Sequence, residues 1–98
     1  MFQNIKGFHW DNENVSHICR HNVEPDEIEE AFFYDRGIKV FEDYLHSDDT
    51  EERFFALAKV PSSRRLLKFV FCFEEEYLRV ITAYQCTHDK KLIWIYTE

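Results

Sequence analysis

The sequence predicts a single α+β domain in which two N-terminal helices pack on a four- to five-stranded antiparallel sheet. Residues 12–33 carry apolar side chains at helical spacing. Residues 38–84 instead alternate apolar and polar positions, or form runs rich in β-branched and aromatic residues. The 98 residues are enough for one modest core, so we expect one domain spanning 1–98.

The β-rich part is organised around a hairpin. Two apolar runs, Leu66–Phe73 and Tyr77–Tyr84, flank the acidic segment 74–76, which we expect to form the turn. The first run is apolar at nearly every position, so we place it at the centre of the sheet. Alternation puts Arg79 and Ala83 on the same face of the second run. A charged side chain in the middle of a strand needs a partner, which makes Arg79 the first candidate functional residue.

The other elements are delimited by helix caps and turns. In chain order we expect a strand at 5–10, helices at 12–21 and 22–33, and strands at 38–45 and 53–60. Asp11 suits the N-cap of the first helix, and Pro25 suits the first turn of the second. Thr87 could cap a C-terminal helix, but the run LIWIY is β-branched and aromatic. Helix and strand therefore both remain open for the C-terminal segment.

Composition restricts the classes of protein that fit. No apolar run approaches the roughly 20 residues that span a bilayer, and the N-terminus lacks the pattern of a signal peptide. We therefore expect a cytoplasmic protein without membrane contact. Three cysteines without CxxC spacing indicate reduced thiols rather than disulfides or a zinc site. No phosphate-binding loop, zinc-protease motif or nucleophile elbow occurs.

The net charge of −7 argues against non-specific binding to long nucleic acids, because such binding depends on neutralising phosphates. A local basic site is still compatible with the sequence. The C-terminal third contains Arg64, Arg65, Lys68, Arg79, Lys90 and Lys91.

One stripe of the first helix carries Asn14, His17 and His21. It can be a polar flank that hydrogen-bonds to loops. It can also face an active cleft, because histidine exchanges protons near neutral pH. A metal site would need Cys19 as well, but Cys19 points to a different face and no third ligand is evident. We therefore predict no metal and no other cofactor.

The segment W-D-x-x-N-x-x-H-I-x-R-H-x-V-x-P-x-E-I-E-E-A-F, at Trp10–Phe32, resembles the opening of the BrnT family, the small toxins of bacterial type II toxin–antitoxin pairs. Later patterns at Glu51–Arg53, Arg65–Leu67 and Arg79–Ala83 extend the resemblance over about residues 8–84. It implies a compact fold similar to RelE and a metal-independent ribonuclease. It also implies a DNA-binding antitoxin similar to BrnA, which neutralises the toxin and represses the shared operon with it. RNA would then be the substrate, and DNA would be contacted only through the antitoxin.

The sequence departs from the family pattern near its C-terminus. Tyr84 stands where the family usually carries an arginine, and Asp89-Lys90 stands near its usual Glu-Arg pair. Two alternatives to the nuclease therefore remain. The chain can be a family member without catalysis that serves as a protein-interaction module. It can also be an interaction protein that pairs with another chain through an exposed sheet edge.

Metal-independent RNA cleavage needs a base, an acid and cations that stabilise the phosphorane. The guanidinium fork matches two phosphate oxygens, so Arg53 and Arg79 are our candidates for the phosphate, with Arg65 third. His21 is the candidate base or acid, with His17 and His88 as alternates, and Tyr84 is a candidate hydrogen-bond donor.

The predicted substrate-binding residues are Asn14, His17, His88 and Lys90. The structural alternative for Arg53 and Arg79 is pairing with a sheet or loop carboxylate such as Asp43 or Glu52.

Overall fold

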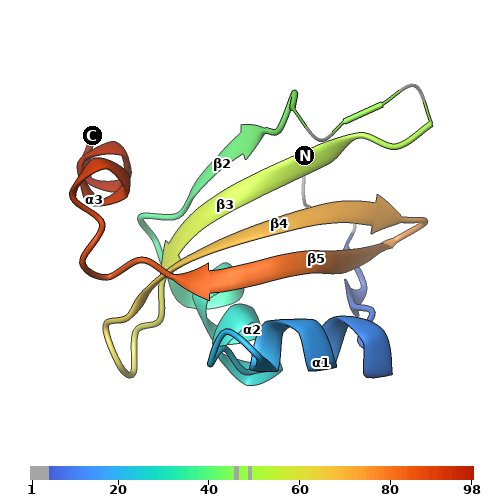
Figure 1. The fold of residues 1–98 in the computed structure, drawn as a ribbon, viewed down its shortest axis with the longest axis horizontal. Coiled ribbons are helices and arrows are strands. Elements are labelled where there is room, and N and C mark those ends of the chain that lie inside the picture. The colour runs from blue at the N-terminus through green and yellow to red at the C-terminus, as the bar shows by residue number, and fades with distance from the viewer. Residues whose placement is uncertain (1–4, 46, 49) are drawn as a thin grey trace.

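The computed structural model describes residues 5–45, 47–48 and 50–98. Its elements, in chain order, are β1 (Gly7–Phe8), α1 (Asn12–Cys19), α2 (Pro25–Tyr34), β2 (Lys39–Glu42), β3 (Arg53–Lys59), β4 (Leu66–Glu74), β5 (Tyr77–Gln85) and α3 (Lys90–Thr97). The strands form one sheet in the order β1-β5-β4-β3-β2. Helices α1 and α2 lie on one side of the sheet and α3 lies near its other side (Figure 1).

The sheet is mixed, so the expectation of a purely antiparallel sheet is wrong. Strands β2 to β5 are antiparallel neighbours, as the hairpin pattern predicted. The short β1 instead runs parallel to the start of β5, with Gly7 opposite Tyr77. Most of the chain lies between β1 and β5, so no hairpin joins these two strands. The antiparallel direction that a short hairpin imposes is therefore not required here.

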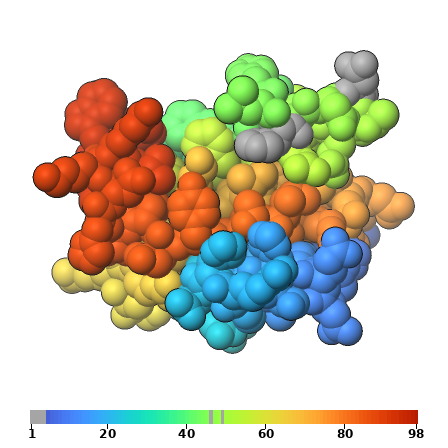
Figure 2. Space-filling view, viewed as in Figure 1, coloured from blue at the N-terminus to red at the C-terminus, as the bar shows by residue number. Residues whose placement is uncertain are grey.

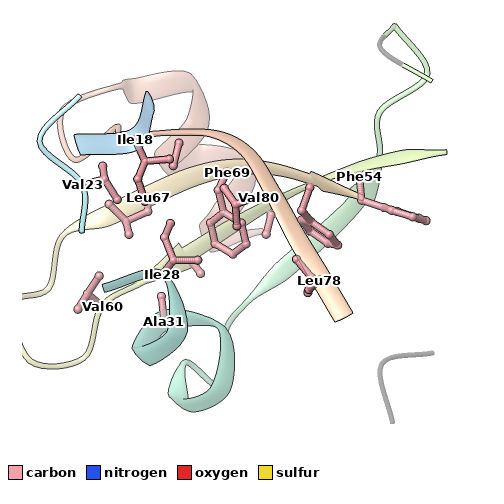
Figure 3. Packing of buried hydrophobic residues seen from close by; sticks show 14 residues of the cluster. Ile18, Val23, Ile28, Ala31, Phe54, Val60, Leu67, Phe69, Leu78 and Val80 are labelled. Atoms are coloured by element: carbon pink, nitrogen blue, oxygen red, sulfur yellow. The ribbon is translucent and has the colours of Figure 1, made fainter. Parts of the chain in front are cut away.

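The main core lies between the sheet and the two N-terminal helices (Figure 3). Ile18 of α1 and Ile28 of α2 are fully buried there together with Phe69 and Phe71 of β4. Phe32 packs edge-on against Phe71, with ring centroids 6.3 Å apart. The apolar faces of both helices are therefore buried against the central strand, and this packing places α1 and α2 on the same side of the sheet.

A smaller apolar cluster lies on the opposite face, beneath α3. Leu57, Leu66 and Cys86 are buried there against the apolar side of α3. The C-terminal segment is thus a helix, because burial of an amphipathic face outweighs its β-branched and aromatic composition. The expected cap is wrong: Asp89 caps α3 by accepting from Leu92 N at 3.1 Å, while the Thr87 hydroxyl accepts from Leu66 N.

The carboxylate of Asp35 joins three distant segments. It accepts from the backbone nitrogens of Gly37 at 3.0 Å and Lys59 at 2.7 Å, and from the Tyr96 hydroxyl at 2.9 and 3.0 Å. Burial and this hydrogen bond raise the pKa of Tyr96 to about 12. The end of α2, the end of β3 and α3 therefore meet at one side chain.

The local signals at the helix starts are confirmed, whereas several predicted elements are too long. Asp11 is the N-cap of α1 in a capping box with Asn14, and Pro25 is the first residue of α2. The strand expected at 5–10 has two residues, and the one expected at 38–45 ends at Glu42. The acidic turn is where the hairpin pattern put it, with Glu74 opposite Tyr77.

A β-bulge changes which residues of β5 share a face. Val70 is opposite Thr82 and Phe71 is opposite Val80, so Ile81 is an additional residue on β5. Ala83 is consequently buried in the helix-side core with Val80. The expectation that Ala83 shares the face of Arg79 is wrong, because strict alternation does not hold across a bulge.

Asn14 fastens α1 to the sheet. Its buried amide donates to the carbonyls of His9 at 3.0 Å and Val80 at 3.2 Å, and its Oδ1 accepts from Asp11 N at 2.9 Å. One side chain thus connects the helix to β5 and to the segment that follows β1.

Replacing Asn14 with alanine should lower the free energy of unfolding by about 1–3 kcal/mol, because the Val80 carbonyl is left buried without its donor. Urea denaturation measures this. Asn12→Ala, at the exposed first position of α1, is the matched control and should cost less than about 0.5 kcal/mol. Equal losses in the two variants would contradict the role given to Asn14.

Candidate functional site

Two arginines lie in one row across the sheet. Arg53 of β3 is opposite Cys72 of β4, and Cys72 is opposite Arg79 of β5. Neighbouring strands are about 4.8 Å apart, so the two arginine backbones are separated by roughly 10 Å. All three residues lie on the face opposite the main core. This spacing allows both guanidinium groups to reach one small anion between them.

A cleft of about 290 Å³ opens over this row. One wall is α1, which lies along β5 (Figure 2), and the Glu51–Arg53 segment contributes the other. The cleft is lined by Glu13, Asn14, His17, Glu51, Arg53, Arg79, Val80 and Ile81.

Arg79 is held by the N-cap of α1. Its Nη1 donates to Asp11 Oδ2 at 2.7 Å and its Nη2 to Oδ1 at 3.4 Å. The hydrogen bond from Arg79 is the main reason that the pKa of Asp11 falls to about 2. Arg79 is 15% exposed, so the pair fixes a nearly buried cation at the edge of the cleft.

Arg53 is held by a carboxylate two residues earlier in the chain. Its Nε and Nη2 donate to Glu51 Oε2 at 3.1 and 3.0 Å. Hydrogen bonds from Cys72 and then from Arg53 lower the pKa of Glu51. Burial and Glu51 together raise the pKa of Cys72 to about 12. Cys72 is therefore a protonated thiol and is unsuited to nucleophilic chemistry.

His17 reaches the cleft from α1. Its Nε2 is 3.0 Å from Thr82 Oγ1 and its Nδ1 is 3.4 Å from Arg20 Nη2. Arginine only donates, so Nδ1 is the acceptor of that bond. The neutral imidazole then carries its proton on Nε2 and donates it to the Thr82 hydroxyl. His17 is thus the imidazole next to the arginine row.

His21, the expected base or acid, lies outside the cleft lining. Helix α1 ends at Cys19, and Asn22 has a φ of 61°. His21 therefore lies beyond the helix and does not continue the stripe of Asn14 and His17. The His21 ring is exposed, with its centroid 5.4 Å from that of His17. The Asn14 amide does line the cleft, but its donor groups are already bonded to backbone carbonyls.

Arg65 is not part of the arginine row. It is seven residues from Cys72 in the chain, which is about 23 Å along β4. Its Nη1 donates to Glu27 Oε2 at 2.6 Å and its Nη2 to the Asn22 carbonyl at 2.9 Å. These contacts tie the start of β4 to α2, which is a structural role.

The remaining candidates lie toward the other end of the sheet. Tyr84 is opposite Lys68, and Lys68 is four residues from Cys72, about 13 Å along β4. His88 is exposed in the turn before α3, and Lys90 is the exposed first residue of α3. The structure therefore brings Arg53, Arg79, His17 and Asn14 together and leaves the other candidates outside the cleft.

Sequence reasoning missed three groups that shape the site. Asp11 and Glu51 bind the two arginines, and Thr82 accepts from His17. Asp11 was recognised only as a helix cap, and its second role depends on a contact across 68 residues. Glu51 has a local signal, because it precedes Arg53 by two residues.

Within the described parts of the chain, no group of three or more histidine, cysteine, aspartate or glutamate side chains could hold a metal ion. Cys19 Sγ lies 3.9 Å from Glu24 Oε2. No helix among the same residues is long and apolar enough to cross a membrane.

A family model described as the ribonuclease toxin BrnT of type II toxin–antitoxin systems matches residues 10–89. The chain belongs to the BrnT family. The match includes every residue that lines the cleft and ends just before α3. BrnT membership indicates a ribonuclease toxin and implies an antitoxin as partner. No curated protein and no solved structure matches the chain.

The Asp11–Arg79 pair should make stability depend on pH. The pKa of Asp11 is about 2 in the folded protein, below its ordinary value of 3.8. The ionised carboxylate therefore adds stability that is complete above about pH 4 and is lost as the pH falls toward 2. Asp11→Asn keeps a good N-cap, so it should destabilise the protein at pH 6 and have much less effect at pH 2.

Urea denaturation at the two pH values tests this prediction. In an Arg79→Gln background, the same Asp11→Asn change should largely lose its pH dependence. If Asp11→Asn lowers stability equally at pH 6 and pH 2 in the protein that keeps Arg79, the pair does not act as described.

Proposed function

We propose that this BrnT protein is a metal-independent endoribonuclease and that the cleft over Arg53, Cys72 and Arg79 is its active site. One observation carries the proposal: two arginines in one row across the sheet flank a cleft that also contains His17. Cations for a phosphate and an imidazole for proton transfer are the groups that this reaction needs.

Both arginines retain donors for a phosphate. A guanidinium has five N–H groups. Arg53 donates two hydrogen bonds to Glu51, and Arg79 donates two to Asp11. The remaining N–H groups can bind the non-bridging oxygens of a phosphate placed between the two side chains. The carboxylates keep both guanidinium groups in position before RNA arrives, which reduces the entropy lost on binding.

In the proposed reaction, the ribose 2′-oxygen attacks the adjacent phosphorus. A base takes the 2′-hydroxyl proton, the new P–O2′ bond forms and the P–O5′ bond breaks. The leaving 5′-oxygen takes up a proton from water, which regains one from the protonated base, so the products are a 2′,3′-cyclic phosphate and a 5′-hydroxyl. Arg53 and Arg79 stabilise the charge of the phosphorane. His17 Nδ1 takes the proton once the Arg20 guanidinium turns from it to a phosphate.

The carboxylates give the cleft little net charge. Glu13 and Glu51 line it beside Arg53 and Arg79, and Asp11 is bound at its edge. RNA would therefore gain little from long-range attraction, in keeping with the net charge of −7. Binding would depend on contacts at the scissile phosphate and on shape rather than on a basic surface.

The proposed biological setting follows the family. A BrnA-like antitoxin would neutralise the nuclease in the cytoplasm, and the complex would repress its own operon through the antitoxin's contact with DNA. We also propose that the fold is similar to RelE, on the basis of two helices and α3 packed around one central sheet.

Alanine at Arg53 or Arg79 should lower the rate of RNA cleavage by about 100-fold or more, because each removes a donor to the phosphorane. His17→Ala should lower it by about 100-fold and remove one limb of the pH–rate profile. Cleavage of end-labelled RNA in EDTA measures this, and EDTA should leave the unsubstituted protein active. Arg36→Ala, at an exposed turn, is the control and should keep full activity.

The alternative is a family member that has no catalysis and serves as an interaction module. The pairing of both arginines with carboxylates favours it, since these pairs are complete without a ligand. Cleavage that is absent in the unsubstituted protein, or unchanged in the Arg53, Arg79 and His17 variants, would support the module over the nuclease.

Glu51→Gln should tighten RNA binding about two- to fivefold at low salt, because it removes the anion that competes with phosphate for Arg53. Filter binding with a non-cleavable 2′-deoxy oligonucleotide measures this. Asp26→Asn makes the same charge change at an exposed position of α2 and should have no more than a small effect. Equal effects of the two variants would refute competition at Arg53.

A further inference from the structure

Strand β2 is an edge of the sheet with unused pairing capacity. Within the described residues, β3 is the only strand that pairs with it. Asp43 N donates to the Arg53 carbonyl at 2.8 Å. Hydrogen-bonded pairs alternate along an antiparallel ladder, so Lys39 and Phe41 face β3 in the same way. The N–H and C=O groups of Val40 and Glu42 therefore point outward.

Large apolar side chains surround this edge. Phe41 is 37% exposed and stacks on Phe55 with ring centroids 5.1 Å apart. Tyr44 and Leu45, just after the strand, are 77% and 92% exposed. An open edge next to exposed apolar side chains is a typical place for another chain to bind.

The charge around the edge identifies the kind of chain that fits. Of the residues 38–52 that the structure describes, five carry carboxylates and one is a lysine, and one of the five, Glu51, is paired with Arg53 in the cleft. Glu42 is close enough to Glu52 that a hydrogen bond between them raises the pKa of Glu52. A second copy of this chain would bring two such acidic edges together, and RNA would bring phosphates against them. A cationic segment of another protein is complementary to both the backbone and the charge.

We propose that a lysine- or arginine-bearing segment of a partner protein adds to β2 as a further antiparallel or parallel strand. Its backbone would pair with Val40 and Glu42, its apolar side chains would cover Phe41, Tyr44 and Leu45, and its cations would face Glu42 and Glu52. For a BrnT protein, the antitoxin is the natural source of such a segment, so the identity of the partner rests on the proposed function. The binding edge itself does not depend on ribonuclease activity.

The test uses the purified full chain and a labelled peptide of about ten residues in which lysine alternates with threonine. Fluorescence anisotropy should show binding that weakens with salt. Hydrogen exchange should slow at the Val40 and Glu42 amides when the peptide is present. A peptide with glutamate in place of lysine, and a lysine peptide N-methylated at alternate backbone nitrogens, should each bind at least about tenfold more weakly.

Paired charge reversals locate the site. Glu42→Lys with Glu52→Lys should weaken binding of the lysine peptide about tenfold or more, because both carboxylates at the edge are reversed. Glu75→Lys with Glu98→Lys changes the net charge equally at the hairpin turn and the C-terminal residue, and should weaken it less than about twofold. Circular dichroism confirms that both variants are folded.

Several results would overturn the proposal. These are equal binding of the lysine and glutamate peptides, undiminished binding of the N-methylated peptide, or equal loss in the two double variants. Protection of the β2 amides in a self-associated form without peptide, or by RNA, would assign the edge to another occupant. Peptide binding at β2 without RNA cleavage would uphold the edge and reject the nuclease, so the two proposals fail separately.

Discussion

The contact between α1 and β5 determines what the cleft contains. The Asn14 amide bonds to the Val80 carbonyl, and Asp11 at the start of the helix binds Arg79. These contacts hold the helix along an otherwise open strand. Only in this position does His17 reach Thr82 and stand beside the arginine row. The site is thus built from a helix, the sheet and the Glu51 segment that precedes β3.

Local features of this chain could be read from its sequence, whereas contacts between distant segments could not. The Asp11 cap, Pro25 at the start of α2 and the β4–β5 turn depend on neighbouring residues, and all three were predicted. The parallel pairing of β1 and the bulge at Ile81 depend on partners far along the chain. The sequence also could not distinguish His17, which lines the cleft, from His21, which does not. The spacing of Asn14, His17 and His21 does not reveal that the helix ends at Cys19.

The arginine partners illustrate the same distinction in the site. Alternation and the resemblance to BrnT toxins selected Arg53 and Arg79, and the register places both beside Cys72. Which carboxylates bind them could not be inferred, because Asp11 is 68 residues from Arg79. With these pairs in place the cleft is nearly neutral, whereas the edge at β2 is strongly negative. The two proposed partners, RNA and a cationic protein segment, would therefore contact different parts of one sheet.

The Asp35 carboxylate has a consequence for how the fold comes apart. It holds a turn, the last residue of β3 and the C-terminal helix through three separate donors. Detaching α3 would break the bond to Tyr96 and uncover Leu57 and Leu66 at the same time. The helix is therefore part of one cooperative unit with the sheet, although it begins after the last residue that the family match includes.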